Sequence, residues 1–179
     1  MTDETSPATT TDDHNYLKIM QYNVNKCREV IDSILNDAQT KDYSLLLIQE
    51  QYRIKLTNSP PIHQSWTLIE PTTTGSTPPR TAIYINNSKL PPTACEHVPI
   101  NHSDITAISI APKPPLVKPS LIINVYNSHE QSLPQRLHNI FTREIPTHRY
   151  RAILVATIPY GIHKATPDKI RKQTLLWKQ

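Results

Sequence analysis

The chain has 179 residues, a formal net charge of +4 and a pI near 9.1, a length that suits one domain with a core of its own. It contains 17 prolines but only 2 glycines, so the Gly-rich phosphate loops of P-loop and Rossmann proteins are excluded and we expect no nucleotide cofactor. Its two cysteines, Cys27 and Cys95, form no CxxC pair, which disfavours a disulfide framework or a zinc knuckle and suits a reducing, intracellular compartment.

Charge divides the chain into three parts. Residues 1–15 carry four acidic and no basic side chains, and this polar segment predicts a disordered leader rather than a signal or transit peptide. Residues 16–163 carry 14 basic and 10 acidic side chains, which suits a phosphate-binding surface but also occurs in many domains without a nucleic-acid partner. Residues 164–179 form a basic tail. No apolar run approaches the roughly 20 residues that cross a bilayer, so we expect no membrane partner.

The first predicted unit, from Leu17 to Tyr52, is a strand, a helix and a second strand. LKIM at Leu17 and LLLI at Leu45 are short apolar runs followed by polar residues, as buried strands are. Between them, apolar residues recur at helical spacing, with Asn25 as the expected N-cap: Val30, Ile31, Ile34, Leu35 and Ala38.

Asn23 and Glu50 stand where these two strands end. A strand-helix-strand crossover usually makes its strands parallel neighbours, and parallel strands end at the same edge of a sheet. We therefore expect the Asn23 amide and the Glu50 carboxylate to lie close together and to offer the oxygen ligands that Mg²⁺ prefers. A carboxylate at a strand end does not by itself make a site.

The rest of the chain predicts five more strands and one helix. Polar or Pro-rich loops separate them, and these loops are either plain surface connections or substrate-holding segments. The helix follows a capping-box signature at Ser132 and turns Leu137, Ile140 and Phe141 to the core. The expected strands are Trp66–Glu70, Arg80–Ile85, Ile105–Ile110, Leu121–Tyr126 and Arg149–Ile158.

Several of these segments together resemble a known family. QYNVNK and LLLIQEQY, followed by PRTAIYINN, SDITAISI and SLIINVYNS, are similar to the endonuclease/exonuclease/phosphatase superfamily, most closely the endonuclease domain of non-LTR (LINE-type) retrotransposons. The match covers roughly Tyr16 to Val155. It implies an α+β, DNase I-like fold, a two-layer β-sandwich flanked by helices, that cuts DNA with Mg²⁺. It also implies a nuclear DNA target and association with a reverse transcriptase.

The same resemblance assigns roles to residues. It implies that Glu50 and Asn23 hold the metal and that the Tyr126 hydroxyl reaches toward the scissile phosphate, with Asn127 beside it as a second catalytic candidate. Related enzymes often carry an acidic residue where this chain has Asn25. For Tyr126 the alternative is a packing residue whose hydroxyl lies in water.

The chain departs from the family at its last predicted strand. The family pattern Gly-Asp-Phe-Asn is absent, and Thr157 stands in the place of the Asp and Pro159 in that of the Asn. Threonine cannot act as a general base near neutral pH, and the proline side chain has no donor or acceptor. Segments that should supply a final His and its carboxylate partner do not follow, so we expect a domain incomplete at its C-terminus. His129 and His163 could lie near the cleft, but exposed or packing roles are expected for both.

Two functions remain open for the chain, and two roles remain open for its C-terminal tail. The chain is either an endonuclease-like, Mg²⁺-dependent phosphodiesterase whose DNA cleavage is impaired or lost, or a non-catalytic remnant or nucleic-acid-binding module with the same fold. The tail from Thr166 to Gln179 is expected to be a short basic amphipathic helix, which either touches nucleic acid or covers the sheet.

Overall fold

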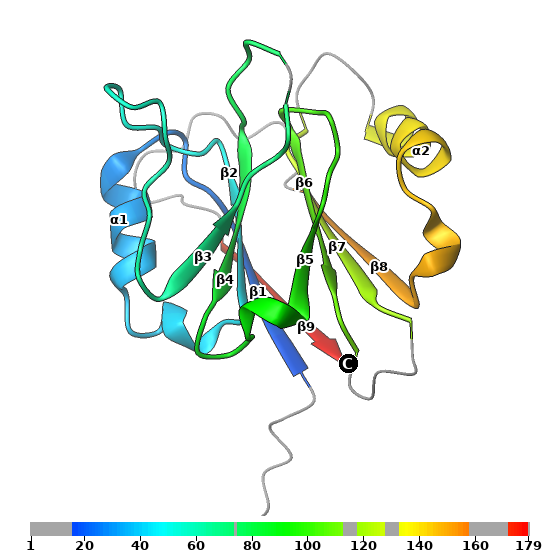
Figure 1. The fold of residues 1–179 in the computed structure, drawn as a ribbon. Helices are drawn as coiled ribbons and strands as arrows, with labels where there is room; N and C mark the ends of the chain where they lie inside the picture. The colour runs from blue at the N-terminus through cyan, green and yellow to red at the C-terminus, as the bar shows by residue number, and fades with distance from the viewer. Residues whose placement is uncertain (1–15, 74, 113–117, 128–132, 158–171, 179) are drawn as a thin grey trace, which may run out of the picture.

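Two β-sheets face each other, and a helix covers the outer side of each (Figure 1). The computed structural model describes residues 16–73, 75–112, 118–127, 133–157 and 172–178. The first sheet has the strand order β3-β4-β2-β1-β9 and the second β5-β6-β7-β8. The predicted α+β sandwich flanked by helices is thereby confirmed.

The helices and strands follow one another along the chain with short 3₁₀ turns between them. In order they are β1 (Tyr16–Asn23), α1 (Arg28–Asn36), η2 (Thr40–Asp42), β2 (Leu45–Gln49), β3 (Trp66–Ile69), β4 (Thr81–Asn86), η3 (Pro92–Ala94), β5 (Cys95–Val98), β6 (Ile105–Ile110), β7 (Ser120–Val125), α2 (Leu133–Arg143), η4 (Thr147–Arg149), β8 (Ala152–Thr157) and β9 (Lys172–Lys178). No helix among the described residues is long and apolar enough to cross a membrane.

Three apolar layers hold these elements together. The layer between the sheets includes Ile19, Leu47, Ile83 and Ile122, all fully buried. On the outer sides, α1 packs on the first sheet and α2 on the second. Strands buried on both faces read as continuous apolar runs, which is why LLLI of β2 was recognisable in the sequence.

The predicted crossover from β1 through α1 to β2 is confirmed. The two strands are parallel neighbours in a register that pairs Asn23 with Gln49. The helix nevertheless begins at Arg28, with Cys27 as its N-cap, so the prediction of Asn25 as N-cap was wrong. Asn25 and Lys26 instead form a turn with positive φ angles of 48° and 53°, which a helix cannot include.

The expected helix in the tail is wrong for the residues that the structure describes there. Lys172–Lys178 form strand β9, which pairs antiparallel with β1. Threonine, leucine and tryptophan fit a strand, and β9 occupies a backbone edge of β1 that would otherwise be unpaired. The sequence analysis did not predict strand β5. The predicted capping box at Ser132 lies outside the described residues.

One edge of the sandwich collects strand ends from both sheets. β1, β2, β7 and β8 end there, and β4 and β6 begin there, because β8 runs parallel to β7, β4 antiparallel to β2 and β6 antiparallel to β7. This site edge lies opposite the end at which the chain enters β1 in Figure 1.

Candidate functional site

Glu50 and Asn23 meet at the site edge, as their strand-end positions predict. The Asn23 side-chain Nδ2 donates to Glu50 Oε1 at 2.8 Å, and Asn23 Oδ1 accepts the backbone N–H of Asn25 at 2.9 Å. Because a backbone N–H can only donate, this second bond determines which end of the Asn23 amide faces Glu50. The Glu50 residue is 8% exposed, so its carboxylate depends on such partners.

The backbone around Glu50 is in an uncommon conformation. Glu50 has a φ of 48°, in the left-handed region that non-glycine residues seldom adopt. Two backbone bonds hold the segment, Val24 N to Gln49 O at 2.9 Å and Lys26 N to Glu50 O at 2.8 Å. Strained backbone of this kind occurs preferentially at functional sites.

Tyr126, at the end of β7, brings the second sheet to the same carboxylate. The side chains of Tyr126 and Glu50 are hydrogen-bonded. Burial, then the Glu50 charge and this hydrogen bond, raise the pKa of Tyr126 to about 12. The phenol is therefore neutral near pH 7 and acts as a donor.

A charged pair lies directly behind Tyr126. Arg80 Nε is 2.5 Å from Asp104 Oδ1, and Arg80 Nη2 is 2.6 Å from Asp104 Oδ2, the bidentate geometry that makes such pairs strong. The Asp104 side chain is 2% exposed and that of Arg80 31%. The Arg80 guanidinium also lies 4.8 Å from the centre of the Tyr126 ring, at cation–π distance.

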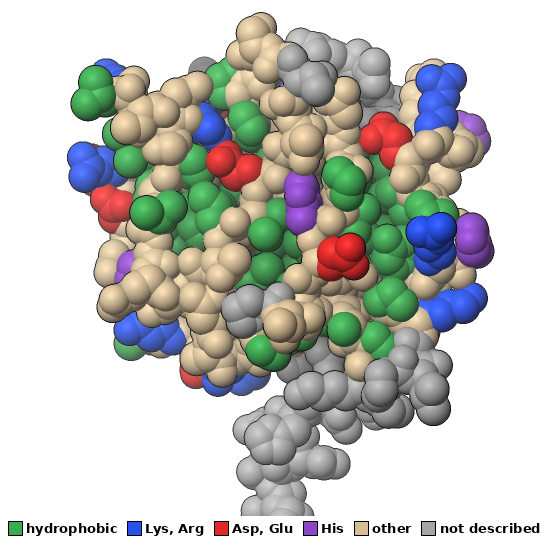
Figure 2. All heavy atoms as spheres, in the orientation of Figure 1, with side chains coloured by type: hydrophobic (Ala, Val, Ile, Leu, Met, Phe, Trp, Pro, Cys, Tyr) green, Lys and Arg blue, Asp and Glu red, His purple; other side chains and the backbone are tan. Residues whose placement is uncertain are grey.

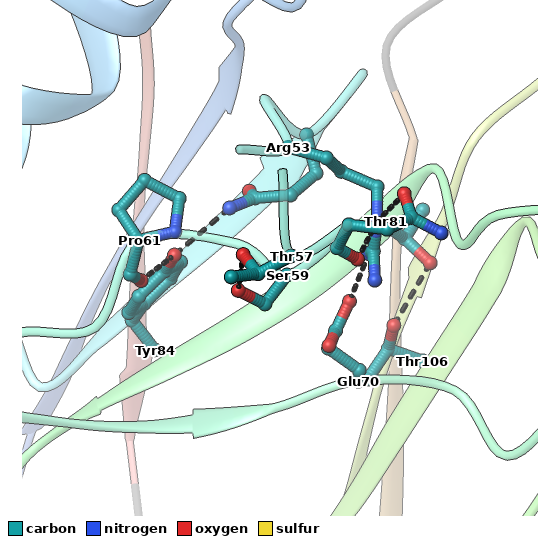
Figure 3. A network of polar contacts seen from close by, with 10 residues as sticks. Arg53, Thr57, Ser59, Pro61, Glu70, Thr81, Tyr84 and Thr106 are labelled. Carbon is teal, nitrogen blue, oxygen red and sulfur yellow. Dashed lines mark hydrogen bonds and ion pairs between the residues drawn. The ribbon is translucent and has the colours of Figure 1, made fainter. Parts of the chain in front are cut away.

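Buried amides and hydroxyls join the two sheets just below these residues. Gln49 Nε2 donates to Val125 O at 2.7 Å, and Asn124 Nδ2 donates to the carbonyl oxygens of Ile48 at 2.8 Å and Ala82 at 3.0 Å. In a matching contact the hydroxyls of Thr81 and Thr106 are 2.8 Å apart (Figure 3). This inter-sheet polar layer sets the distance between Glu50 on one sheet and Tyr126 on the other.

The residues at the edge fit a hard cation in part. The Glu50 carboxylate is a suitable ligand, and Asn23 Oδ1 has a second lone pair besides the one that accepts the Asn25 N–H. Across the described residues, no group of three His, Cys, Asp or Glu side chains could hold a metal ion. A protein that binds Mg²⁺ usually supplies only one or two carboxylates, with waters and substrate phosphates as the remaining ligands.

The structure describes the other predicted site residues only in part. Thr157 ends β8 opposite Val125 of β7, so its backbone reaches the site edge. The Thr157 side chain lies outside what the structure describes, as do Pro159, His129 and His163. Asn127 is half-buried directly after Tyr126.

Comparison with known proteins identifies the fold. No protein-family model and no curated protein matches the chain. Among solved structures it is similar to the endonuclease domain of TRAS1, a telomere-specific non-LTR retrotransposon, with a TM-score of 0.57 and 15% identity. That alignment covers 79% of this chain and 59% of the other. The chain has the DNase I-like nuclease fold.

A second solved structure is more weakly similar. The AP endonuclease LMAP from Leishmania major aligns with a TM-score of 0.48 and 12% identity, over 75% of this chain and 47% of that one. The chain thus spans about half to three fifths of the length of these two nucleases. The DNase I-like fold that the sequence resemblance implies is confirmed by the TRAS1 alignment.

Sequence reasoning did not assign roles to Arg80, Asp104, Gln49 and Asn124. A weak signal existed, because Arg80 and Asp104 each stand directly before an apolar strand. Their pairing requires the starts of β4 and β6, which belong to different sheets, to lie face to face. No spacing in the sequence indicates this.

Proposed function

We propose that this chain is a magnesium-dependent phosphodiesterase of the endonuclease type that acts on DNA, with a nuclear target. The observation that carries the proposal is the Glu50 carboxylate, nearly buried at the site edge and hydrogen-bonded to the Asn23 amide and the Tyr126 phenol. The DNase I-like fold supports it, because the TRAS1 domain with this fold is an endonuclease.

In the proposed site, Glu50 supplies a carboxylate oxygen and Asn23 its amide oxygen to a Mg²⁺ ion. When bound, such an ion stabilises the charge that develops on a reacting phosphate. The Asn23 NH₂ group donates to Glu50 Oε1 and so holds the Glu50 carboxylate in one orientation. Asn127, which follows Tyr126 in the sequence, is a further polar side chain that would contact the same phosphate.

Tyr126 provides the hydrogen-bond donor. Its phenol remains protonated near neutral pH, because its pKa is raised to about 12, and it can donate to a phosphate oxygen that approaches Glu50. Arg80 lies against the face of the Tyr126 ring and restricts its orientation.

The cleavage that we expect is slow. Positioned acid–base groups contribute about 10²–10⁴-fold to rates, and the sequence has Thr157 and Pro159 where the family has its aspartate and asparagine. A second candidate, a nucleic-acid-binding module without catalysis, is favoured by the identities of Thr157 and Pro159, since neither side chain supplies a carboxylate or an amide.

A nicking assay distinguishes the two candidates. Supercoiled plasmid is incubated with the full chain in Mg²⁺, and the Glu50→Gln variant is compared with Glu96→Gln, a matched change at an exposed position of β5. Wild type and Glu96→Gln should nick the plasmid, and Glu50→Gln should be slower by about 10² or more. Equal nicking by wild type and Glu50→Gln would overturn the enzyme proposal.

If neither wild type nor any variant nicks the plasmid, Mg²⁺ binding is measured instead. Titration calorimetry with Mg²⁺ should give a saturable signal that Glu50→Gln abolishes. Salt-dependent binding to duplex DNA without any nicking or magnesium signal would support the non-catalytic module instead.

A further inference from the structure

One buried side chain of the sandwich is unpaired at both ends of its amide group. Gln21 of β1 is fully buried, and neither its Nε2 nor its Oε1 has a hydrogen-bond partner among the residues that the structure describes. Leaving a buried polar atom unpaired costs about 1–3 kcal/mol. Since buried polar atoms are nearly always paired in native proteins, Gln21 requires a specific explanation.

The Gln21 side chain points between the two sheets, on the face of β1 that leads to the site edge. Side chains alternate along a strand, and Ile19 belongs to the layer between the sheets while Met20 packs on the α1 side. Gln21 therefore shares its face with Ile19 and with Asn23. Residues two apart on a strand are separated by about 6–7 Å, so Gln21 lies one step below the pair of Asn23 and Glu50.

The neighbouring strands explain why this amide is unpaired. Gln21 pairs in register with Leu47 of β2, an apolar residue of the same layer. The side chains that β8 contributes to this layer, Leu154 and Ala156, are also apolar. The Gln49 amide, one level nearer the site edge, donates to a backbone oxygen of β7 instead. The inter-sheet polar layer is therefore built without Gln21.

The fold alone does not account for a polar residue at this position. An apolar side chain would match the surrounding Leu47, Ile83 and Ile122, which are fully buried in the same layer, and it would avoid the cost of an unpaired amide. Local departures from such consistency are typical of functional sites. The nearest candidate site is the one at Glu50, one step along β1 and β2.

We propose that Gln21 is a positioning residue of the Mg²⁺ site, whose amide oxygen accepts a hydrogen bond from a water bound to the ion. This inference rests on the proposed function, because it requires Mg²⁺ at Glu50 and Asn23. Mg²⁺ usually keeps several of its waters in proteins, and a water bound to a cation directs its hydrogens outward and donates. Oε1 of Gln21 is the acceptor that such a water needs, while Nε2 can donate to a further water.

The acidic side chains on the face shown in Figure 2 are scattered. The coloured Asp and Glu side chains lie apart from one another there, and across the described residues no group of three His, Cys, Asp or Glu side chains could hold a metal ion. A saturable Mg²⁺ signal is therefore expected from the Glu50 edge, and its loss in Glu50→Gln verifies that origin.

Titration calorimetry of the full chain with Mg²⁺ tests the proposal. Gln21→Met keeps the length of the side chain without a strong donor or acceptor, and it should raise the Kd for Mg²⁺ about tenfold or more, as loss of an outer-shell partner does. Gln21→Leu, a second apolar replacement, should have the same effect. Leu47→Met, at the paired buried position of β2, is the matched control and should bind Mg²⁺ like wild type.

Urea unfolding in EDTA and in saturating Mg²⁺ distinguishes a positioning role from a structural one. In EDTA, Gln21→Met should be at least as stable as wild type, because it leaves no unpaired amide in the core. In Mg²⁺ it should gain less stability than wild type, by about 1.4 kcal/mol for a tenfold increase in Kd. A purely structural role would change the stability equally in both conditions.

The outcomes separate this proposal from the function on which it rests. If Gln21→Met and Gln21→Leu bind Mg²⁺ as tightly as wild type while Glu50→Gln does not bind, the Gln21 proposal is overturned and the magnesium site stands. Equal losses of stability in EDTA and in Mg²⁺ would make Gln21 a packing residue and also overturn it. If wild type itself gives no saturable signal, the Mg²⁺ site of the proposed function fails, and the role of Gln21 fails with it.

Discussion

Replacing Arg80 by methionine should destabilise the domain strongly, because it removes the partner of a buried carboxylate. The Asp104 side chain is 2% exposed and receives two bonds from the Arg80 guanidinium, at 2.5 and 2.6 Å. Removing one partner of a buried ion pair costs about 3–5 kcal/mol. Arg80 is 31% exposed, so water already screens part of the pair and we expect a loss of about 2–3 kcal/mol.

Chemical and thermal denaturation measure this loss. For a chain of this length, a loss of that size lowers Tm by about 4–12 °C. Arg28→Met is the control, because Arg28 forms a largely exposed ion pair with Asp32 on α1 at 3.3 Å, and such pairs contribute about 1 kcal/mol or less.

A double variant separates the charge effect from packing. Arg80→Met with Asp104→Leu should recover most of the stability that Arg80→Met loses, because apolar replacements of a whole buried pair are often neutral. The reasoning is refuted if Arg80→Met loses no more than Arg28→Met, or if the double variant is less stable than Arg80→Met.

Three further predictions follow from the site. The ultraviolet phenolate signal of Tyr126, identified as the signal that Tyr126→Phe removes, should titrate near pH 12 rather than 10, and it should titrate lower in Glu50→Gln. Because the folded pKa of Tyr126 is higher than the unfolded one, its contribution to the free energy of unfolding is complete below pH 10 and is lost as the pH rises toward 12. Asn124→Leu should cost about 2–4 kcal/mol in urea unfolding, because it removes the side-chain donor to two buried carbonyl oxygens and the more distant of the two acceptors of the Gln49 amide. Thr157→Asp should speed plasmid nicking at least about tenfold, and only with Glu50 intact.

Most of the fold was predictable because its strands have a simple sequence pattern. β2, β6 and β7 are apolar runs bounded by polar residues, and the crossover through α1 determines that β1 and β2 are parallel. That rule also predicted the proximity of Asn23 and Glu50. The tail was misjudged because its helical and strand patterns differ little over seven residues, and pairing with β1 decided the outcome.

The parts of the site that depend on two sheets were not predictable. Gln49 and Asn124 are polar residues within apolar strands, which the sequence alone would assign equally to an exposed face. Their bonds cross between sheets, from β2 to β7 and back. The α1 N-cap failed for a local reason, since Asn25 serves a left-handed turn that directs its N–H to Asn23.

The pairing of β8 with β7 determines where residue 157 lies. β7 and β8 are parallel and pair Val125 with Thr157, so residue 157 reaches the edge that Tyr126 occupies whatever its side chain is. Residue 157 is the position at which the sequence resemblance leads us to expect an aspartate, and the strand pairing brings its backbone to this edge. The group of Glu50, Asn23 and Tyr126 is built by β1, β2 and β7 and does not depend on residue 157. The slow cleavage that we propose would then depend on the side chain at residue 157, which is why one substitution in β8 is expected to change the rate.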